Sequence, residues 1–383
     1  MIIRVFTMFS GYDSQCMALD RLKEKYPEFD YELIGWAEID KYAIQAHNAV
    51  YPQWADRNYG DVSKIDWGKV PDFDLLTYSS PCQDFSQAGK QAGGTEGSGT
   101  RSSLLWECRR AILAKKPKYL LMENVAALVS QKFIRLFNAW QLEVERYGYT
   151  NFAQVLNAKD YGVPQSRKRI FIASILNCEQ TYYFPAPVKL TKRLKDVLEK
   201  EVDEKYYLKE DALDGYKPSE KQDDTIVLGW SRDSKGNIVN RHPVEVANCV
   251  TAAKRDNTSN YVVEPSGIEI GISVHPLSRK KEFRGFDTEK APALRCTDYK
   301  CPHCVNNGLR IRKLTEREYF RLMGVCEEYI DLIQAAGISR SQQYKMAGNS
   351  IVVDVLTAIF EQLLFNNIKR MTPTLHFHQF QMR

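Results

Sequence analysis

The chain has 383 residues, of which 44% are hydrophobic and 26% are charged, and it carries a net charge of +5. This composition excludes wholesale disorder, and the length predicts two or three domains. The surplus of 53 Lys and Arg over 48 Asp and Glu permits a polyanionic partner without identifying one. No apolar run approaches the roughly 20 residues of a membrane-spanning helix. The nine cysteines are odd in number and scattered, so we expect free thiols in a reducing cytoplasm and no membrane contact.

Short β-rich runs alternate with helical stretches as far as residue 175. We expect strands at residues 2–8, 31–38, 73–78, 119–122, 153–156 and 169–175, and helices at residues 13–26, 41–50, 104–114 and 133–147. Strands separated by helices predict an α/β fold with a mainly parallel sheet covered on both faces. In such sheets ligands bind beyond the carboxyl ends of the strands.

This regular pattern ends at the proline-rich segment 184–188, where we place a hinge. From there to residue 312 the chain is irregular and rich in turns, and helices are expected again at residues 314–323 and 339–365. The last helix has an apolar face formed by Val352, Val355, Ile359 and Leu363. We therefore expect a first domain at residues 1–185, a smaller one at 186–338, and a segment at 339–383 that returns to the first.

Candidate ligand-binding residues follow the first two strands. Gly11 lets the backbone pass close to a ligand at the start of a helix. Glu38, at the end of the second strand, is placed to accept both hydroxyls of a ribose, and Asp61 lies in a turn near the same edge. The alternatives are an ordinary strand-to-helix turn at Gly11, a helix cap at Asp40 and a turn residue at Asp61.

The strongest signal is the segment Ser79-Ser80-Pro81-Cys82-Gln83, which follows a predicted strand and precedes a glycine-rich loop. A thiol in such a loop is partly exposed and can become a nucleophile, whereas an inert buried Cys normally lies in an apolar run. The next strand delivers Glu123 to the same edge, where it is a candidate general acid.

Three donors alternate further along the chain, at Gln165, Arg167 and Arg169. On an extended backbone they share one face, which suits a phosphate or a base carbonyl. An exposed basic strand edge is the alternative interpretation.

Together these motifs resemble the cytosine-5 DNA methyltransferase family, whose order they follow across nearly the whole chain. The matching motifs are Phe9-x-Gly11, Glu38, Gly60-Asp61, Pro81-Cys82-Gln83-x-Phe85-Ser86, Arg101-x-x-Leu104, Glu123-Asn124-Val125, Gln165-x-Arg167-x-Arg169, the segment from Arg312 to Gly324, and Gly348-Asn349-Ser350. Two positions depart from the family pattern. Asp13 stands where the first loop usually has its second Gly, and Ser79 and Ser80 replace a stretch that is glycine-rich in many members.

The resemblance implies a Rossmann-like, mixed and mainly parallel sheet of the S-adenosylmethionine-dependent methyltransferase type, with a smaller, irregular, β-rich target-recognition domain. It implies that Cys82 is the nucleophile, that Glu123 and Arg169 grip a flipped cytosine, and that Arg167 orders the site or contacts phosphate. The residues expected to line the S-adenosylmethionine pocket are Phe9, Ser10, Gly11, Glu38, Ile39, Asp61, Val62, Pro81, Leu104 and Asn349.

The implied partner is double-stranded DNA, read by residues 186–312, which carry no family motif. Arg279–Phe286 interleaves cations with aromatics, as in a DNA-facing strip, although a solvated loop has the same composition. Cys296, Cys301, His303 and Cys304 lack the spacing of a zinc site, so we expect no metal. We expect a cytoplasmic monomer from a bacterium or phage, with any restriction endonuclease encoded separately.

Two other functions remain open from the sequence. A related branch of the family modifies transfer RNA, and a catalytically silent DNA-binding protein would keep the same fold. The long 186–312 insert favours contacts that read a DNA sequence. The presence of Cys82, Glu123 and Arg169 argues against a silent protein.

Overall fold

The computed structural model describes residues 1–81, 101–207 and 309–365, together with the short stretches 226–232, 238–244, 246–248, 261–265, 272–274, 304–305 and 369–370.

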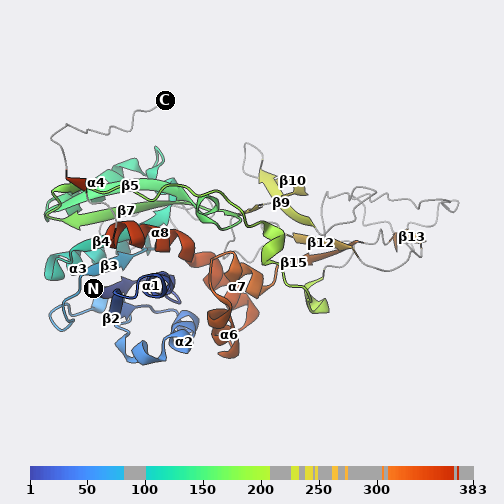
Figure 1. Ribbon diagram of the computed structural model, residues 1–383, viewed down its shortest axis with the longest axis horizontal. Helices are drawn as coiled ribbons and strands as arrows, with labels where there is room; N and C mark the ends of the chain where they lie inside the picture. Colours follow the sequence, from blue (N-terminus) through green and yellow to red (C-terminus); the bar gives the residue numbers. More distant parts are fainter. Residues whose placement is uncertain are drawn as a thin grey trace.

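A six-stranded sheet forms the centre of the protein, with the strand order β2-β1-β3-β4-β7-β5 (Figure 1). Strands β1 (Ile2–Met8), β2 (Asp30–Ala37), β3 (Leu75–Tyr78) and β4 (Tyr119–Val125) run parallel. Strand β7 (Lys168–Leu176) is antiparallel both to β4 and to the edge strand β5 (Tyr149–Asn157). This is the mixed, mainly parallel sheet that the sequence predicts.

The strand order reverses at β1, because β2 lies on one side of β1 and β3 on the other. Ligands of open α/β sheets bind at such a reversal, beyond the carboxyl ends of the strands. The carboxyl ends of β1 and β3 carry the loops that begin at Phe9 and Ser79. The loops that contain the predicted motifs therefore lie at the edge of the sheet where a ligand is expected.

Helices cover both faces of the sheet. Helices α1 (Ser14–Lys25), α2 (Lys41–Val50) and α8 (Val353–Leu364) contribute to one buried cluster, and α3 (Cys108–Lys115) and α4 (Ile134–Glu145) to the other. Along β4 the side chains alternate between the two clusters, because successive residues of a strand point to opposite faces of the sheet. Tyr119 and Leu121 belong to the first cluster, and Leu120 and Met122 belong to the second.

The C-terminal helices differ from the sequence prediction in two ways. The single helix expected at 339–365 is two, α7 (Arg340–Asn349) and α8, and a helix not predicted at all, α6 (Glu327–Ala335), follows α5 (Glu316–Arg321). The break after α7 follows Gly348, a poor helix former. It also frees backbone carbonyls, and Arg167 binds those of Gly348 and Ser350.

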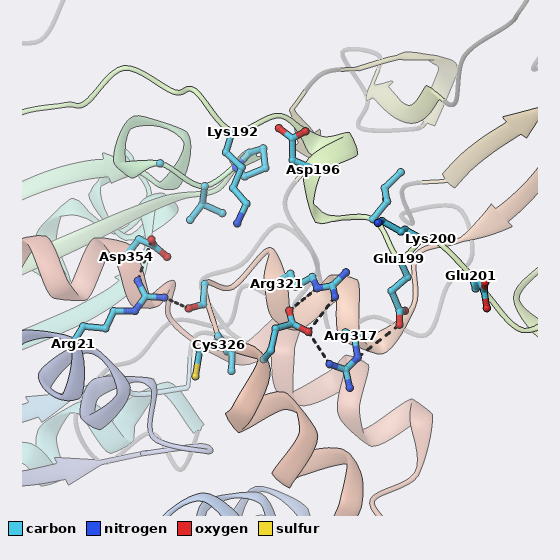
Figure 2. A pocket seen from close by; sticks show the side chains of 17 residues that line it. Arg21, Lys192, Asp196, Glu199, Lys200, Glu201, Arg317, Arg321, Cys326 and Asp354 are labelled. Carbon is cyan, nitrogen blue, oxygen red and sulfur yellow. Dashed lines mark hydrogen bonds and ion pairs between the residues drawn. The ribbon is translucent and has the colours of Figure 1, made fainter. Parts of the chain in front are cut away.

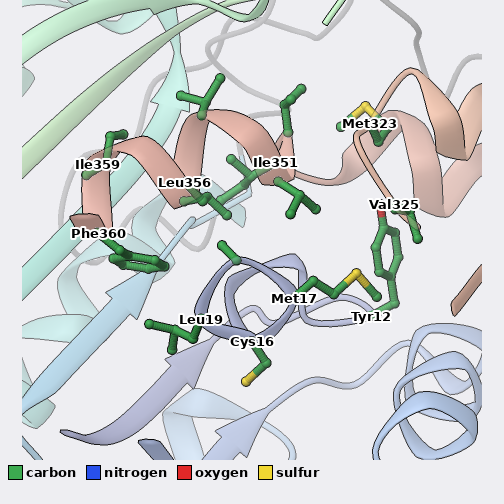
Figure 3. Close-up of a cluster of buried hydrophobic side chains, with 14 of the residues drawn as sticks. Tyr12, Cys16, Met17, Leu19, Met323, Val325, Ile351, Leu356, Ile359 and Phe360 are labelled. Atoms are coloured by element: carbon green, nitrogen blue, oxygen red, sulfur yellow. The ribbon is translucent and has the colours of Figure 1, made fainter. Parts of the chain in front are cut away.

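Helix α8 lies across α1, with Leu356 and Phe360 turned toward it (Figure 3). The predicted apolar face is confirmed, since Val352, Val355, Ile359 and Leu363 are all buried. Taken together, Arg340–Leu364 is long and apolar enough to cross a membrane, yet 56% of its most apolar window is buried inside the protein. Packing in the core accounts for that composition.

A smaller antiparallel sheet has the order β10-β9-β12-β15 and lies beyond α7 (Figure 1). Its strands are β9 (Ile226–Arg232), β10 (Ile238–Pro243), β12 (Tyr261–Pro265) and β15 (Leu309–Lys313). The two-residue or three-residue strands are β6 (Gln165–Ser166), β8 (Gln180–Thr181), β11 (Ala247–Asn248), β13 (Ile272–Val274), β14 (Cys304–Val305) and β16 (Lys369–Arg370).

Short 3-10 helices connect many of these elements. Residues 104–107, expected to start a helix, belong to such a turn, and α3 begins only at Cys108; 3-10 turns are frequent at helix ends. The 3-10 helices are Pro52–Arg57, Val62–Lys64, Arg101–Glu107, Ala126–Val129, Ala158–Tyr161, Leu194–Val197 and Glu204–Tyr206.

Candidate active site

The loop after β1 has an unusual backbone. Phe9, Gly11 and Asp13 all have positive φ, at 58°, 61° and 67°. Glycine adopts this conformation without steric cost, and Asp tolerates it better than most residues. Asp13 therefore fills the position of the family's second Gly with the backbone conformation that favours a glycine, and its side chain caps α1 by accepting the N–H of Cys16 at 3.2 Å.

Glu38 is tied to this loop. Its Oε2 accepts the Gly11 N–H at 2.9 Å, and its Oε1 accepts the N–H groups of Ile39 and Asp40, both at 2.8 Å. A carboxylate offers about four acceptor positions, so capacity for a hydroxyl remains. Ile39 beside it is 72% exposed, which leaves an apolar surface next to the carboxylate.

Asn58 joins Glu38 to the turn that carries Asp61. Its side chain accepts the N–H groups of Glu38 and Gly60 at 3.2 and 2.9 Å and donates to the Glu38 carbonyl at 3.1 Å. Hydrogen bonds from Ser63 hold the pKa of Asp61 below its ordinary value. Sequence reasoning missed Asn58, because its only signal is its position two residues before Gly60.

Phe9, Val62 and Leu104 are associated with the same hydrophobic cluster. Val62 is buried in the cluster on the α3–α4 side of the sheet, and Phe9 and Leu104 pack against its edge. Asn349 is exposed at the end of α7. The adjacent Ser350 hydroxyl donates to that of Ser14 at 3.2 Å, so the end of α7 lies at the N-terminus of α1.

A carboxyl group is held firmly at the end of the central strands. Glu123, 8% exposed, lies inside β4, which runs three residues longer than predicted. Its Oε1 is 3.1 Å from Nε of Arg169, and its Oε2 accepts the Ser79 hydroxyl at 3.1 Å. Next to it, Asn124 Nδ2 donates to the Ser80 carbonyl at 3.2 Å.

Cys82, the predicted nucleophile, lies outside the described residues, which stop at Pro81 and resume at Arg101. The strand that leads into Pro81 is nevertheless the parallel neighbour of β4, with Tyr78 opposite Met122. The backbone that enters Cys82 therefore leaves the sheet beside Glu123.

The three alternating donors have different surroundings. Arg167, 3% exposed, donates to the carbonyls of Gly348 and Ser350 at 2.9 and 2.7 Å. Gln165, fully buried, donates to the Leu322 carbonyl at 2.6 Å. Arg169 instead pairs with the Glu123 carboxyl in β4. Gln165 and Arg167 thus bind backbone carbonyls of the C-terminal segments. The alternative interpretation, an exposed basic strand edge, is wrong for these two residues because both are buried.

A cavity of about 770 Å³ lies elsewhere, between α1, the 192–201 segment and α5, and no predicted site residue lines it (Figure 2). Its charged side chains are largely paired with one another: Arg21 with Asp354, and Arg317 with Glu199. Among the described residues, no group of His, Cys, Asp and Glu could hold a metal ion. Cys296, Cys301 and His303 lie outside them, and of Cys304 only the backbone, in β14, is described.

The chain is similar to known proteins over nearly its whole length. The family model of C-5 cytosine-specific DNA methylases matches residues 3–364. The type II methyltransferase M2.ScrFI of Lactococcus lactis subsp. cremoris is 32% identical, over 94% of this chain and 99% of its own. The orphan methyltransferase M.SPRI of Bacillus phage SPR is 30% identical, over 96% of this chain and 99% of its own.

Solved structures agree on the fold. The Entamoeba histolytica methyltransferase EhMeth matches with a TM-score of 0.61 at 17% identity, covering 95% of this chain and 98% of its own. The Dnmt2 methyltransferase of S. pombe matches with a TM-score of 0.58 at 18% identity, covering 94% and 98%. The fold is thus the Rossmann-like one that the resemblance implies.

The family match also decides between the functions that the sequence left open. A family specific for cytosine in DNA favours DNA over transfer RNA as the substrate, and catalysis over silent binding. The chain belongs to the C-5 cytosine-specific DNA methylase family and is a DNA cytosine-5 methyltransferase.

Proposed function

We propose that the carboxyl ends of β1 to β4 form the active site for S-adenosylmethionine-dependent methylation of a cytosine in duplex DNA, with Cys82 as nucleophile. The observation that carries this proposal is the Glu123 carboxyl, held by Arg169 at 3.1 Å beside the strand end that leads into Pro81 and Cys82. A carboxyl fixed next to the entrance of a loop that carries a candidate nucleophile is the arrangement that acid catalysis at that nucleophile requires.

The donor and acceptor set fits an adenosine. Glu38 retains acceptor capacity for the ribose hydroxyls, Ile39 offers an exposed apolar surface for a base, and Asp61 offers an acceptor for an exocyclic amine. Phe9, Val62 and Leu104 supply apolar lining nearby. The remaining predicted lining, from Ser10, Gly11, Pro81 and Asn349, completes the proposed pocket. S-adenosylmethionine, when bound, supplies an electrophilic methyl group.

The protein groups then have separate tasks. Carbon 5 of cytosine is a weak nucleophile, and attack of the Cys82 thiolate on carbon 6 makes it reactive by pushing electrons into the ring. After the methyl group is transferred to carbon 5, loss of the carbon 5 proton to a base breaks the bond to Cys82 and restores the thiolate. Glu123 donates a proton or hydrogen bond to ring nitrogen 3 and so stabilises the developing negative charge. Arg169 steadies Glu123, and its role toward the base would be to donate to the carbonyl at position 2. Arg167 orders the site through Gly348 and Ser350.

Carbon 6 is inaccessible inside a duplex, so the target base must swing out at a cost of about a few kcal/mol. We propose that residues 186–338 form the domain that supplies the compensating DNA contacts, and that residues 339–383 return to the catalytic domain. The relatives named above come from a bacterium and a bacteriophage. We propose accordingly that this protein acts as a monomer in the cytoplasm and that any restriction endonuclease is encoded separately.

Duplex DNA that contains 5-fluorocytosine tests the mechanism, because fluorine at carbon 5 cannot leave as a proton and the enzyme stays attached. Wild-type protein with S-adenosylmethionine should form a complex that survives denaturation, and Cys82→Ala should form none. Transfer RNA bearing the same base serves as the second substrate and should not be trapped. Failure of the wild type to be trapped on DNA, or undiminished trapping by Cys82→Ala, would contradict the proposal.

A further inference from the structure

Ser79 stands at a position where many family members are glycine-rich, and its side chain touches the proposed general acid. The Ser79 hydroxyl donates to Oε2 of Glu123 at 3.1 Å, while Arg169 holds Oε1 at the same distance. A glycine offers no such group. The proposal below rests on the function proposed above, in which Glu123 acts on the flipped cytosine.

Strand register brings the two residues together. Strands β3 and β4 are parallel neighbours, with Leu76 opposite Leu120 and Tyr78 opposite Met122. Ser79 directly follows the end of β3, and Glu123 is the residue after Met122 in β4, so the extended backbone brings the two side chains to the same place. The contact thus joins the first residue after β3 to a residue inside the neighbouring strand β4.

The hydroxyl differs in kind from the guanidinium on the other oxygen. Arg169 can only donate hydrogen bonds, whereas a serine hydroxyl donates to a carboxylate and accepts from a protonated carboxyl. Ser79 can therefore remain bonded to Glu123 in both protonation states. A carboxyl that gives a proton to a base and takes it back needs a partner of this kind to keep its orientation.

We propose that Ser79 is a positioning residue for Glu123, one that keeps the carboxyl aimed at the flipped base while its proton moves. Catalytic groups must be held close to the productive geometry, and small displacements reduce rates strongly. Two fixed partners, one on each oxygen, leave the Glu123 carboxyl a single orientation.

The adjacent residue provides a matched control. Ser80 is 3% exposed, and among the described residues its hydroxyl has no hydrogen-bond partner. Ser80→Ala also removes a serine hydroxyl, one position further along the chain, and leaves the contacts of Glu123 with Ser79 and Arg169 in place. Ser79→Thr keeps the hydroxyl and should rescue what Ser79→Ala loses.

The experiment measures single-turnover methyl transfer to duplex DNA together with the Kd for S-adenosylhomocysteine by calorimetry. Losing a hydrogen bond to a charged group costs a rate factor of roughly ten to a hundred, so Ser79→Ala should transfer the methyl group that much more slowly. Its Kd for S-adenosylhomocysteine should stay within about twofold of wild type. Ser80→Ala and Ser79→Thr should keep the rate within about threefold.

A double-mutant cycle with Glu123→Gln shows whether Ser79 acts through Glu123. In the Glu123→Gln background, Ser79→Ala should slow transfer much less than in wild type. Equal losses in Ser79→Ala and Ser80→Ala, no rescue by Thr, or additive losses with Glu123→Gln would each overturn the proposal. A wild-type protein that methylates no DNA would instead overturn the proposed function itself.

Discussion

His47 and Asp13 face each other with no solvent exposure, Nε2 of the histidine lying 3.6 Å from Oδ2 of the aspartate. The Thr7 hydroxyl donates to Oδ2 of Asp13 at 3.0 Å, and it lies 3.1 Å from the Ser10 hydroxyl in the loop proposed to bind the cofactor. The ring of His47 stacks on Trp36 with centroids 3.7 Å apart. A buried polar network therefore supports the loop where a glycine was expected, and it joins β1 to α2.

Asp13→Ala should destabilise the protein, because it removes the cap of α1, removes the hydrogen bond from Thr7 and forces Ala into a left-handed conformation. Summing a lost cap and a strained backbone gives about 2–4 kcal/mol of unfolding free energy. Asp13→Asn should lose less, because Asn caps helices and tolerates positive φ. Urea unfolding measures both. Asp66→Ala, in an exposed turn, is the control, and equal stabilities for all three variants would contradict the role given to Asp13.

Glu38→Ala should weaken S-adenosylmethionine binding. Loss of a charged acceptor for hydroxyl groups costs on the order of 1.5–3 kcal/mol, or about tenfold to a hundredfold in Kd. Glu38→Gln retains the shape and one acceptor for the Gly11 N–H, so it separates the charge from the loop geometry. Calorimetry with S-adenosylmethionine gives the Kd. An unchanged affinity in both variants would remove Glu38 from the pocket.

Glu327 should make stability depend on acidic pH. Two hydrogen bonds from Arg321, and a further one from Arg317, lower the pKa of Glu327 from 4.5 to about 2. A carboxyl with a lowered folded-state pKa stabilises the protein above its unfolded-state pKa, and this contribution disappears as the pH falls through the folded-state value.

The unfolding free energy of wild type should therefore fall more steeply than that of Glu327→Gln as the pH decreases from 4.5 to 2. Urea unfolding at a series of pH values measures the two slopes. Glu328→Gln makes the same change of charge on the same helix, at a residue without an ion pair to any described side chain, and should behave like wild type. Parallel curves for wild type and Glu327→Gln would contradict this role of the ion pairs.

Recognition of the DNA target sequence should be separable from methyl transfer to the cytosine. The catalytic groups can act on any extruded cytosine, so they cannot select a site, and selection requires contacts to base edges. Exchanging residues 186–312 for the segment of a related enzyme should transfer the methylated sequence, as read by bisulfite sequencing. Cofactor affinity and covalent trapping should stay near wild type. A folded, active chimera that still methylates the original sequence would place recognition outside residues 186–312. Residues 83–100 would then be the next segment to exchange.

The sequence by itself determined the sheet, the family and most of the candidate site residues, because each of these depends on local information. Alternating apolar residues mark the strands, and short motifs such as Glu123-Asn124-Val125 follow them directly. The same local patterns predicted the buried face of α8.

Only the tertiary structure decided the partners of these residues. Arg167 and Gly348 are far apart in sequence, as are Ser79 and Glu123 and also Asp13 and His47, yet each pair is in contact. The break between α7 and α8 has the same origin, since the carbonyls it frees are bound by an arginine from another part of the chain. Periodicity reports which face of an element is apolar, whereas strand order and register decide which polar side chains meet across elements. That is why the residues were predictable one by one, but the networks that hold Glu123 and the first loop were not.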